Sequence, residues 1–364
     1  MSSQHFCSAA ALAALLVGAS GSAPALGCAP CPPSGKPVVN ADQSVIILWD
    51  AAKKTEHFIR RASFKSDADD FGFLIPTPAQ PELAESGNEA FPFLQSLTEP
   101  KTITAPRPSG LACGCSATKN AVPSGATVPA VRVLTEKDVA GFHAVVLETK
   151  SSDALVDWLK ENGYAFSPEI KAWATPYVEG GWKITALKVA KRKDAGDKQL
   201  VAAGALRLSF QTDRPLFPYR EPDPTEAAKT LGARDRLLRI YFLADARFFG
   251  KFDSNAPWTG TPAWANKLSA EDHRKTLDLL GLPESTGPAN WWLTEFEDHW
   301  PYELAHSDLY FMQSVKQEKL ERDPIIIYVS SPLPNDVTFY AMVGLVILPP
   351  YVRRLRRRRG QAAK

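Results

Sequence analysis

Residues 44–50 read SVIILWD, a short apolar run that ends at an acidic residue. Two similar runs follow, EHFIRRASFK at residues 56–65 and FGFLIPTP at residues 71–78, with polar breaks between them. Each run has the length and the β-branched or aromatic content of a strand. Because the three runs follow one another closely, we expect them to form an antiparallel meander.

The rest of the chain alternates between further strands and a few short helices. Strand patterns occur at residues 141–149, 181–191, 205–212, 236–246 and 323–332, and helical patterns at residues 88–97, 151–164 and 269–280. In the second helix, SSDALVDWLKENGY, Ser152 or Asp153 can cap the N-terminus, and Gly163 can end the helix. The expected class is α+β, mostly antiparallel sheets with a few short helices.

Proline and glycine mark the expected breaks in this organisation. Residues 100–129 are rich in Pro, Gly, Ser and Thr and are expected to form a loop, and residues 213–225 contain four prolines and are expected to form a linker. We therefore expect an α+β domain over residues 28–250 and a smaller helical and strand part over residues 251–336.

The N-terminus has the pattern of an export signal. Residues 9–17 read AAALAALLV, and the small residues GASGSAPALG follow. An uncharged run of this length is too short to span a bilayer but matches a signal-peptide core before a cleavage region. We predict a signal peptide over residues 1–27, the alternative being a buried N-terminal helix.

The C-terminus has the pattern of a membrane anchor. The sixteen residues from Val337 to Val352 contain no charge, and RRLRRRR follows, including Arg353, Arg354 and Arg356. A basic cluster of this kind stays on the cytoplasmic side of a membrane. We predict one transmembrane helix over residues 337–352, with the lipid bilayer as its partner. Residues 353–364 then form a cytoplasmic tail, and the body lies on the periplasmic side. The alternative is a buried strand or helix before a basic tail.

Four cysteines would remain after signal cleavage. They form two clusters, Cys28 with Cys31, and Cys113 with Cys115. An even number in an exported protein favours two disulfides, and we favour links between the clusters because Cys-Gly-Cys would close a strained ring. A zinc site, a redox dithiol and lipidation of Cys28 are the alternatives.

The charge distribution argues against nucleic acid as a partner. From Cys28 to Asp336 the chain carries 35 Lys and Arg against 40 Asp and Glu, a net charge of −5. A broad nucleic-acid surface needs clustered cations to displace phosphate counterions.

Patterns that carry chemistry are weak. Residues 67–72, DADDFG, lack the ligands that a calcium loop needs at its fifth and twelfth positions, so a polar turn is the preferred interpretation. His299, Glu303 and His306 lie in the densest group of acidic and histidine residues, which on a helix would be a candidate zinc or iron site. Solvated side chains are the default for this group, and we predict no cofactor.

Large aromatic residues are frequent from residue 173 onward. They are Trp173, Tyr177, Trp182, Trp258, Trp264, Trp291, Trp292 and Trp300. Such side chains can line a groove for glycan strands, but most are expected in the core. The adjacent pair Trp291 and Trp292 is the best candidate to expose one ring, because neighbouring residues of a strand point to opposite faces.

Several spaced stretches resemble one bacterial family. They read PVVNADQSVIILWD, SDADDFGFLIPTP, SDALVDWLKENGYAFSP, YVEGGWKITALKV and LRLSFQTDRPLFPYR, and they occur in this order between Cys28 and Ala246. The chain is similar to the family known as domain of unknown function 2330. The resemblance implies an exported body with a C-terminal anchor and supplies no reaction, ligand or catalytic residue.

Two hypotheses for function follow. The first is a membrane-anchored extracytoplasmic module of the cell envelope with a binding or structural role, whose partner is an envelope protein or a glycan. The second is an exported metal-dependent hydrolase that uses His299, Glu303 and His306.

Overall fold

A computed structural model describes most of the body of the chain. The described residues are 29–31, 38–40, 43–61, 63–66, 70–106, 131–164, 168–190, 200–202, 204–222, 236–253, 257–300, 307–329, 346 and 350–354. The chain forms two compact units. The larger consists of Met1–Leu97 and Thr118–Leu320, and the smaller of Thr98–Ala117 and Glu321–Lys364.

Two large sheets dominate the larger unit. The five-stranded sheet has the order β1 (Ala29–Cys31), β6 (Asp70–Thr77), β11 (Lys183–Ala190), β10 (Phe142–Thr149), β9 (Val131–Val139). The seven-stranded sheet has the order β17 (Thr261–Lys267), β18 (Trp292–Trp300), β15 (Arg236–Ala244), β3 (Gln43–Asp50), β4 (Thr55–Arg61), β13 (Ala205–Gln211), β7 (Glu82–Ser86). Within these two sheets β15 and β3 pair in parallel, and the other paired strands are antiparallel.

Smaller elements complete this unit. One three-stranded sheet has the order β14 (Leu216–Phe217), β19 (Leu309–Gln313), β16 (Phe248–Phe252), and another has the order β12 (Leu200–Ala202), β5 (Ser63–Ser66), β2 (Val38–Asn40). The helices are α1 (Ala90–Thr98), α2 (Ser152–Glu161), α3 (Pro168–Glu179) and α5 (Ala270–Leu279).

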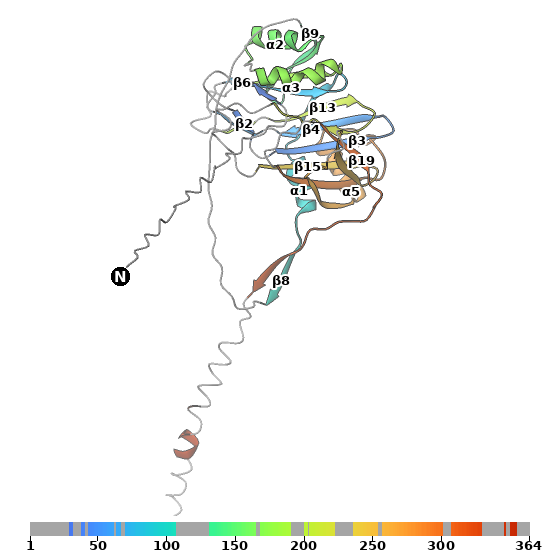
Figure 1. The fold of residues 1–364 in the computed structure, drawn as a ribbon. Coiled ribbons are helices and arrows are strands. Elements are labelled where there is room, and N and C mark those ends of the chain that lie inside the picture. Colours follow the sequence, from blue (N-terminus) through green and yellow to red (C-terminus); the bar gives the residue numbers. More distant parts are fainter. Residues whose placement is uncertain are drawn as a thin grey trace, which may run out of the picture. The chain divides into compact units, whose positions relative to one another are not determined.

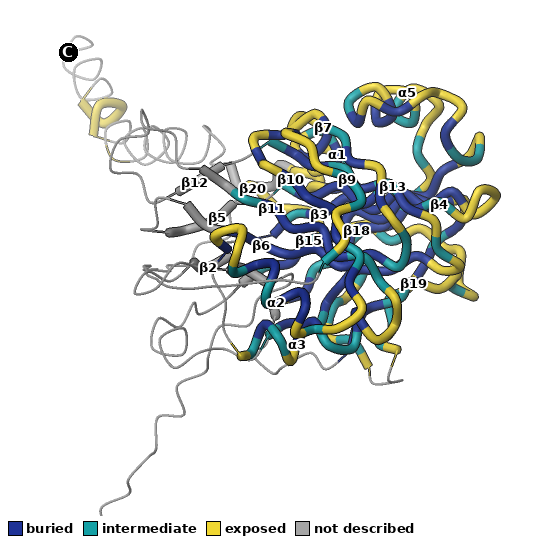
Figure 2. The backbone as a smooth tube through the Cα atoms, turned by 90° about the horizontal axis from the view of Figure 1, so that it is seen from above, coloured by how far each residue is buried: buried dark blue, intermediate teal, exposed yellow. Residues whose placement is uncertain are grey.

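The two large sheets lie between two layers of helices (Figure 1). Ile47 of the seven-stranded sheet and Phe73 of the five-stranded sheet belong to the core cluster between the sheets. The neighbouring residue Ile46 points to the opposite face, into the cluster that includes residues of α1 and α5. The outer face of the five-stranded sheet packs on α2 and α3. Strands of both sheets are therefore buried on both faces (Figure 2), as continuous apolar runs such as VIIL indicate.

Helix α2 shows how local sequence determines an element. Its N-cap is Ser151, whose Oγ accepts a hydrogen bond of 3.1 Å from the backbone N–H of Ala154. This places the cap one residue before the expected Ser152. Leu155 and Leu159 are buried on the sheet side. Gly163 follows the helix with a φ of 69°, a backbone conformation that glycine adopts without strain.

The α+β class with mostly antiparallel sheets is confirmed, whereas the expected meander is wrong. The third run, FGFLIPTP, forms β6 in the five-stranded sheet, while β3 has β4 and β15 as neighbours. A continuous apolar run carries no information on which sheet it joins, so the sequence could not separate the two sheets. Helix α3 was not expected, because Pro176 inside it removes the helical signal.

The expected division at residue 250 does not separate two sheets. Strands β17 and β18, which follow residue 250, belong to the same seven-stranded sheet as β3 and β15. Hydrogen bonding between distant strands therefore joins the parts before and after residue 250 into one sheet.

The smaller unit contains a two-stranded parallel ribbon. It pairs β8 (Thr102–Pro106) with β20 (Ile325–Val329), with Ile103 directly opposite Ile326. A salt bridge of 2.8 Å between Lys101 and Glu321 lies just before the two strands. Within the described part of the chain, no helix combines the length and the apolar character that crossing a membrane requires.

Candidate functional site

The tip of the β9–β10 hairpin is the starting point of the candidate site. Ala140 and Gly141 form the turn and have φ values of 53° and 81°. Two-residue hairpin turns favour positive φ because the turn then matches the twist of the strands. Glycine adopts this conformation freely, whereas for Ala140 it costs about 1–2 kcal/mol. The turn therefore holds a strained residue.

Packing keeps this strained residue in place. Ala140 is buried, and its carbonyl accepts a hydrogen bond of 3.0 Å from the backbone N–H of Gly204. A Cβ atom on Gly204 would lie 3.4 Å from the Cβ of Ala140, so the backbones of the two residues are close together. The hairpin tip is thus docked beside the start of β13.

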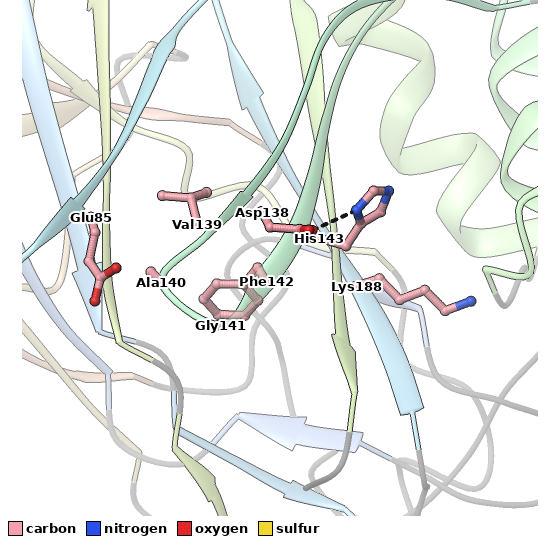
Figure 3. A pocket seen from close by; sticks show the side chains of 8 residues that line it. All are labelled: Glu85, Asp138, Val139, Ala140, Gly141, Phe142, His143 and Lys188. Atoms are coloured by element: carbon pink, nitrogen blue, oxygen red, sulfur yellow. Dashed lines mark hydrogen bonds and ion pairs between the residues drawn. The ribbon is translucent and has the colours of Figure 1, made fainter.

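A cleft of about 560 Å³ surrounds the tip (Figure 3). It is lined by Glu85, Asp138, Val139, Ala140, Gly141, Phe142, His143 and Lys188. Across the hairpin, Nδ1 of His143 lies 2.9 Å from a carboxylate oxygen of Asp138, and Nε2 lies 3.3 Å from Glu136. In Figure 3, Glu85 is on one side of the turn, and Asp138, His143 and Lys188 are on the other.

The cleft has the properties of a binding site for a polar ligand. Its volume lies within the range of typical ligand pockets, about 300–1,000 Å³. Glu85 and Asp138 can accept hydrogen bonds, and Lys188 can attract an anionic group. The charged groups lie on two sides of the turn rather than around one point. This arrangement suits a ligand that extends across the turn.

A buried hydrogen-bond centre surrounds Asp298 on β18. Its carboxylate accepts hydrogen bonds from the hydroxyl of Tyr219 (2.6 Å), the indole N–H of Trp258 (2.8 Å) and the hydroxyl of Thr259 (2.9 Å). Burial, followed by the charge of Asp298, raises the pKa of the Tyr219 phenol. Through Tyr219, this carboxylate connects the proline-rich stretch to the central sheet.

A second buried carboxylate, Asp308, connects the same stretch to helix α3. It accepts hydrogen bonds from the Tyr177 hydroxyl at 2.6 Å and from the Arg220 backbone N–H at 3.2 Å. Burial raises its pKa, and the hydrogen bond from Tyr177 opposes this shift. The Trp173 indole N–H donates to the carbonyl of Arg220 at 2.8 Å. Asp298 belongs to the acidic and histidine group that the sequence singled out, but the sequence did not indicate the tyrosine partner of either carboxylate, because these partners are 79 and 131 residues away.

The expected helix around His299 is wrong. Residues 292–300 form strand β18, in which His299 lies opposite Leu237 and is exposed, while Asp298 points to the core. The period of the pattern is therefore two, not 3.6. Glu303 and His306 lie outside the described residues. Among the residues that are described, no group of three or more His, Cys, Asp or Glu could hold a metal ion.

Most predictions at the two ends of the chain stay predictions. Cys28, Cys113, Cys115, the DADDFG stretch up to Asp69 and nearly all of residues 337–352 lie outside the described residues. Cys31 is in β1, but its side chain is also outside them. Arg353 and Arg354 are helical and exposed.

The aromatic residues lie mainly in the core, as expected. Trp173, Tyr177, Trp291 and Trp292 are buried, and Trp182, Trp258 and Trp264 are partly buried. The expectation that Trp291 or Trp292 exposes a ring is wrong. Trp291 packs directly on Gly287, where an added Cβ would lie 2.2 Å from its ring. The side chain of Trp300 lies outside the described residues.

The arrangement defines an α+β protein in which two large sheets lie between helices, with a polar cleft at a hairpin tip. The chain belongs to the family described as uncharacterized protein conserved in bacteria (DUF2330), whose model matches residues 22–306. The expected family membership is confirmed. Comparisons with curated proteins and with solved structures give no match.

Proposed function

We propose that this protein is a membrane-anchored extracytoplasmic binding module of the bacterial cell envelope, and that the hairpin cleft binds an envelope glycan. The observation that carries the binding role is the strained, buried Ala140 in the lining of a charged cleft. Backbone strain that packing maintains is found preferentially at binding and catalytic sites.

The lining of the cleft favours a glycan. The carboxylates of Glu85 and Asp138 are exposed and can accept hydrogen bonds from sugar hydroxyls. Lys188, whose Nζ lies 5.7 Å from the centre of the Tyr164 ring, can pair with an acidic substituent of the sugar.

Calorimetric titration of soluble peptidoglycan fragments into the purified full-length chain tests the ligand. Saturable binding is expected, and Glu85→Gln and Asp138→Asn should each weaken it about tenfold, because each removes a charged acceptor. Asp213→Asn is the matched control, since Asp213 is exposed and pairs with Lys54 on another surface. No binding by the unchanged chain, or equal binding by all four proteins, would contradict the glycan proposal.

The anchored topology rests on the uncharged residues 337–352 and the arginines that follow them. Alkaline carbonate should leave the full-length chain in the membrane fraction, and a reporter fused after Lys364 should be active only in the cytoplasm. Release by carbonate, or periplasmic reporter activity, would contradict the anchor without affecting the glycan proposal.

A further inference from the structure

A serine and a histidine face each other on the seven-stranded sheet, on the face that carries α5. Ser209 of β13 lies directly opposite His57 of β4, and Oγ of Ser209 is 2.8 Å from Nδ1 of His57. A serine hydroxyl becomes an effective nucleophile when a neutral imidazole within hydrogen-bond distance takes its proton. The pair has the distance that this chemistry requires.

A loop over residues 281–287 crosses the strand that carries His57. At its start, Arg207 of β13 donates hydrogen bonds to the carbonyls of Leu280 (2.6 Å) and Gly281 (3.0 Å). At its end, the backbone N–H of Gly287 donates to Asp50 at the end of β3, at 3.1 Å. Because β4 lies between β13 and β3, the loop passes over β4 between these two attachment points.

The surroundings keep His57 in the form that can accept a proton. Burial, followed by the positive charge of Arg207, lowers the pKa of His57 to about 4, with Asp50 opposing and Lys53 adding to the effect. His57 is therefore neutral at pH 7. Ser209 lies towards the edge of the sheet, where its other neighbour is the exposed Glu82 of β7. His57 and Ser209 are both partly buried, and Ser209 lies one strand in from the edge strand β7.

We propose that Ser209 is the nucleophile and His57 the general base of an acyl-transfer site for carboxylic esters. Oγ of Ser209 forms a bond to the ester carbonyl carbon, and its proton passes to Nδ1 of His57. The bond to the alcohol oxygen then breaks, and the alcohol leaves with the proton from His57. Water hydrolyses the acyl-serine and restores both groups. This activity is independent of the anchor and of the hairpin cleft.

A fluorophosphonate probe tests the nucleophile directly on the purified full-length chain. In the labelling step the serine Oγ–P bond forms, the P–F bond breaks, fluoride leaves, and the serine proton passes through His57 to solvent. Peptide mass spectrometry of the unchanged chain should find one adduct per chain, on Ser209. An adduct on another residue, or no adduct, overturns the proposal without relying on any variant.

Variants and pH test the role of His57. Ser209→Ala should abolish labelling, and His57→Gln should slow it about 100-fold, the size of a typical general-base contribution. Ser285→Ala is the matched control, because it removes an exposed serine of the nearby loop. This variant should be labelled on Ser209 at the rate of the unchanged chain. The labelling rate should rise through about pH 4 and be constant between pH 6 and 8. The proposal is overturned if the His57→Gln variant has the melting temperature of the unchanged chain and is labelled as fast as that chain. It is also overturned if the labelling rate of the unchanged chain increases in proportion to the hydroxide concentration.

Discussion

Residues 216–221 and strand β20 carry opposite signals in the sequence and occupy opposite environments. The first segment lies in a proline-rich stretch typical of a linker, yet Leu216, Phe217, Tyr219 and Glu221 are buried. The second, Ile325–Val329, is apolar, yet Ile325, Ile326 and Ile327 are each about half exposed, at 52%, 47% and 49%. Composition thus indicates which residues can be buried. Whether they are buried depends on the side chains and strands that pack against them.

The partners of the two segments differ in kind. Residues 216–221 meet buried carboxylates from three distant parts of the chain: Glu56 accepts from the N–H of Leu216 at 2.8 Å, Asp298 accepts from Tyr219, and Asp308 accepts from the N–H of Arg220. In the described part of the chain, β20 has one strand partner, β8. Two strands alone offer few contacts, and parallel pairs are normally covered on both faces.

Removing the central carboxylate of the buried segment should produce the largest effect. Asp298→Ala leaves the hydrogen-bond donors of Tyr219, Trp258 and Thr259 without their acceptor in the interior. We expect a loss of about 3–5 kcal/mol in the free energy of unfolding, measured with urea. Asp213→Ala, at an exposed ion pair, should change it by less than about 0.5 kcal/mol. Equal losses in the two variants would mean that the segment is held by packing alone.

Elements with a local pattern could be predicted from the sequence, and their pairing could not. Helix α2 was predictable because its cap, its apolar face and its terminal glycine all lie within residues 151–164. The parallel pairing of β15 with β3 was not predictable, because residues 195 positions apart carry no shared local signal. The same reason hid the carboxylates that hold residues 216–221.

The candidate site was missed for a related reason. Strand β9, Val131–Val139, contains the exposed charged run 136–138 and is largely exposed, so it did not resemble the apolar runs that indicated the other strands. Without β9 there was no hairpin, and Gly141 was the only sign of a turn. The strain at Ala140 can be found only in the structure.

The pH dependence of stability that comes from Glu56 tests how residues 216–221 are held. We expect its effect on the free energy of unfolding to be intermediate. Burial raises its pKa well above the ordinary value, and the hydrogen bond from Leu216 opposes this shift. The folded chain therefore keeps this proton to a higher pH than the unfolded chain does. Stability from this group is fully present below about pH 4.5 and is lost as pH rises towards the folded pKa.

The variant Glu56→Gln should remove this pH dependence. Urea unfolding at pH 5 and pH 8 should show that the unchanged chain loses more stability over this interval than the variant does, with a slope difference of at most about 1.4 kcal/mol per pH unit. Parallel losses in the two proteins would show that Glu56 reaches solvent or finds another partner. Glu82→Gln, at an exposed position of β7, is the matched control and should follow the unchanged chain.

A substitution in the exposed strand β20 should have the smallest effect on the free energy of unfolding. A small effect would support the contrast between β20 and residues 216–221. Ile326→Ala removes apolar atoms that are already about half in contact with water, so the free energy of unfolding should fall by about 1 kcal/mol or less. Ile47→Ala makes the same change at a fully buried position of β3 and should cost about 2–5 kcal/mol. If urea unfolding of the full-length chain finds equal costs at the two positions, another surface covers Ile326. Burial would then follow composition in β20 as well, and the contrast with residues 216–221 would be lost.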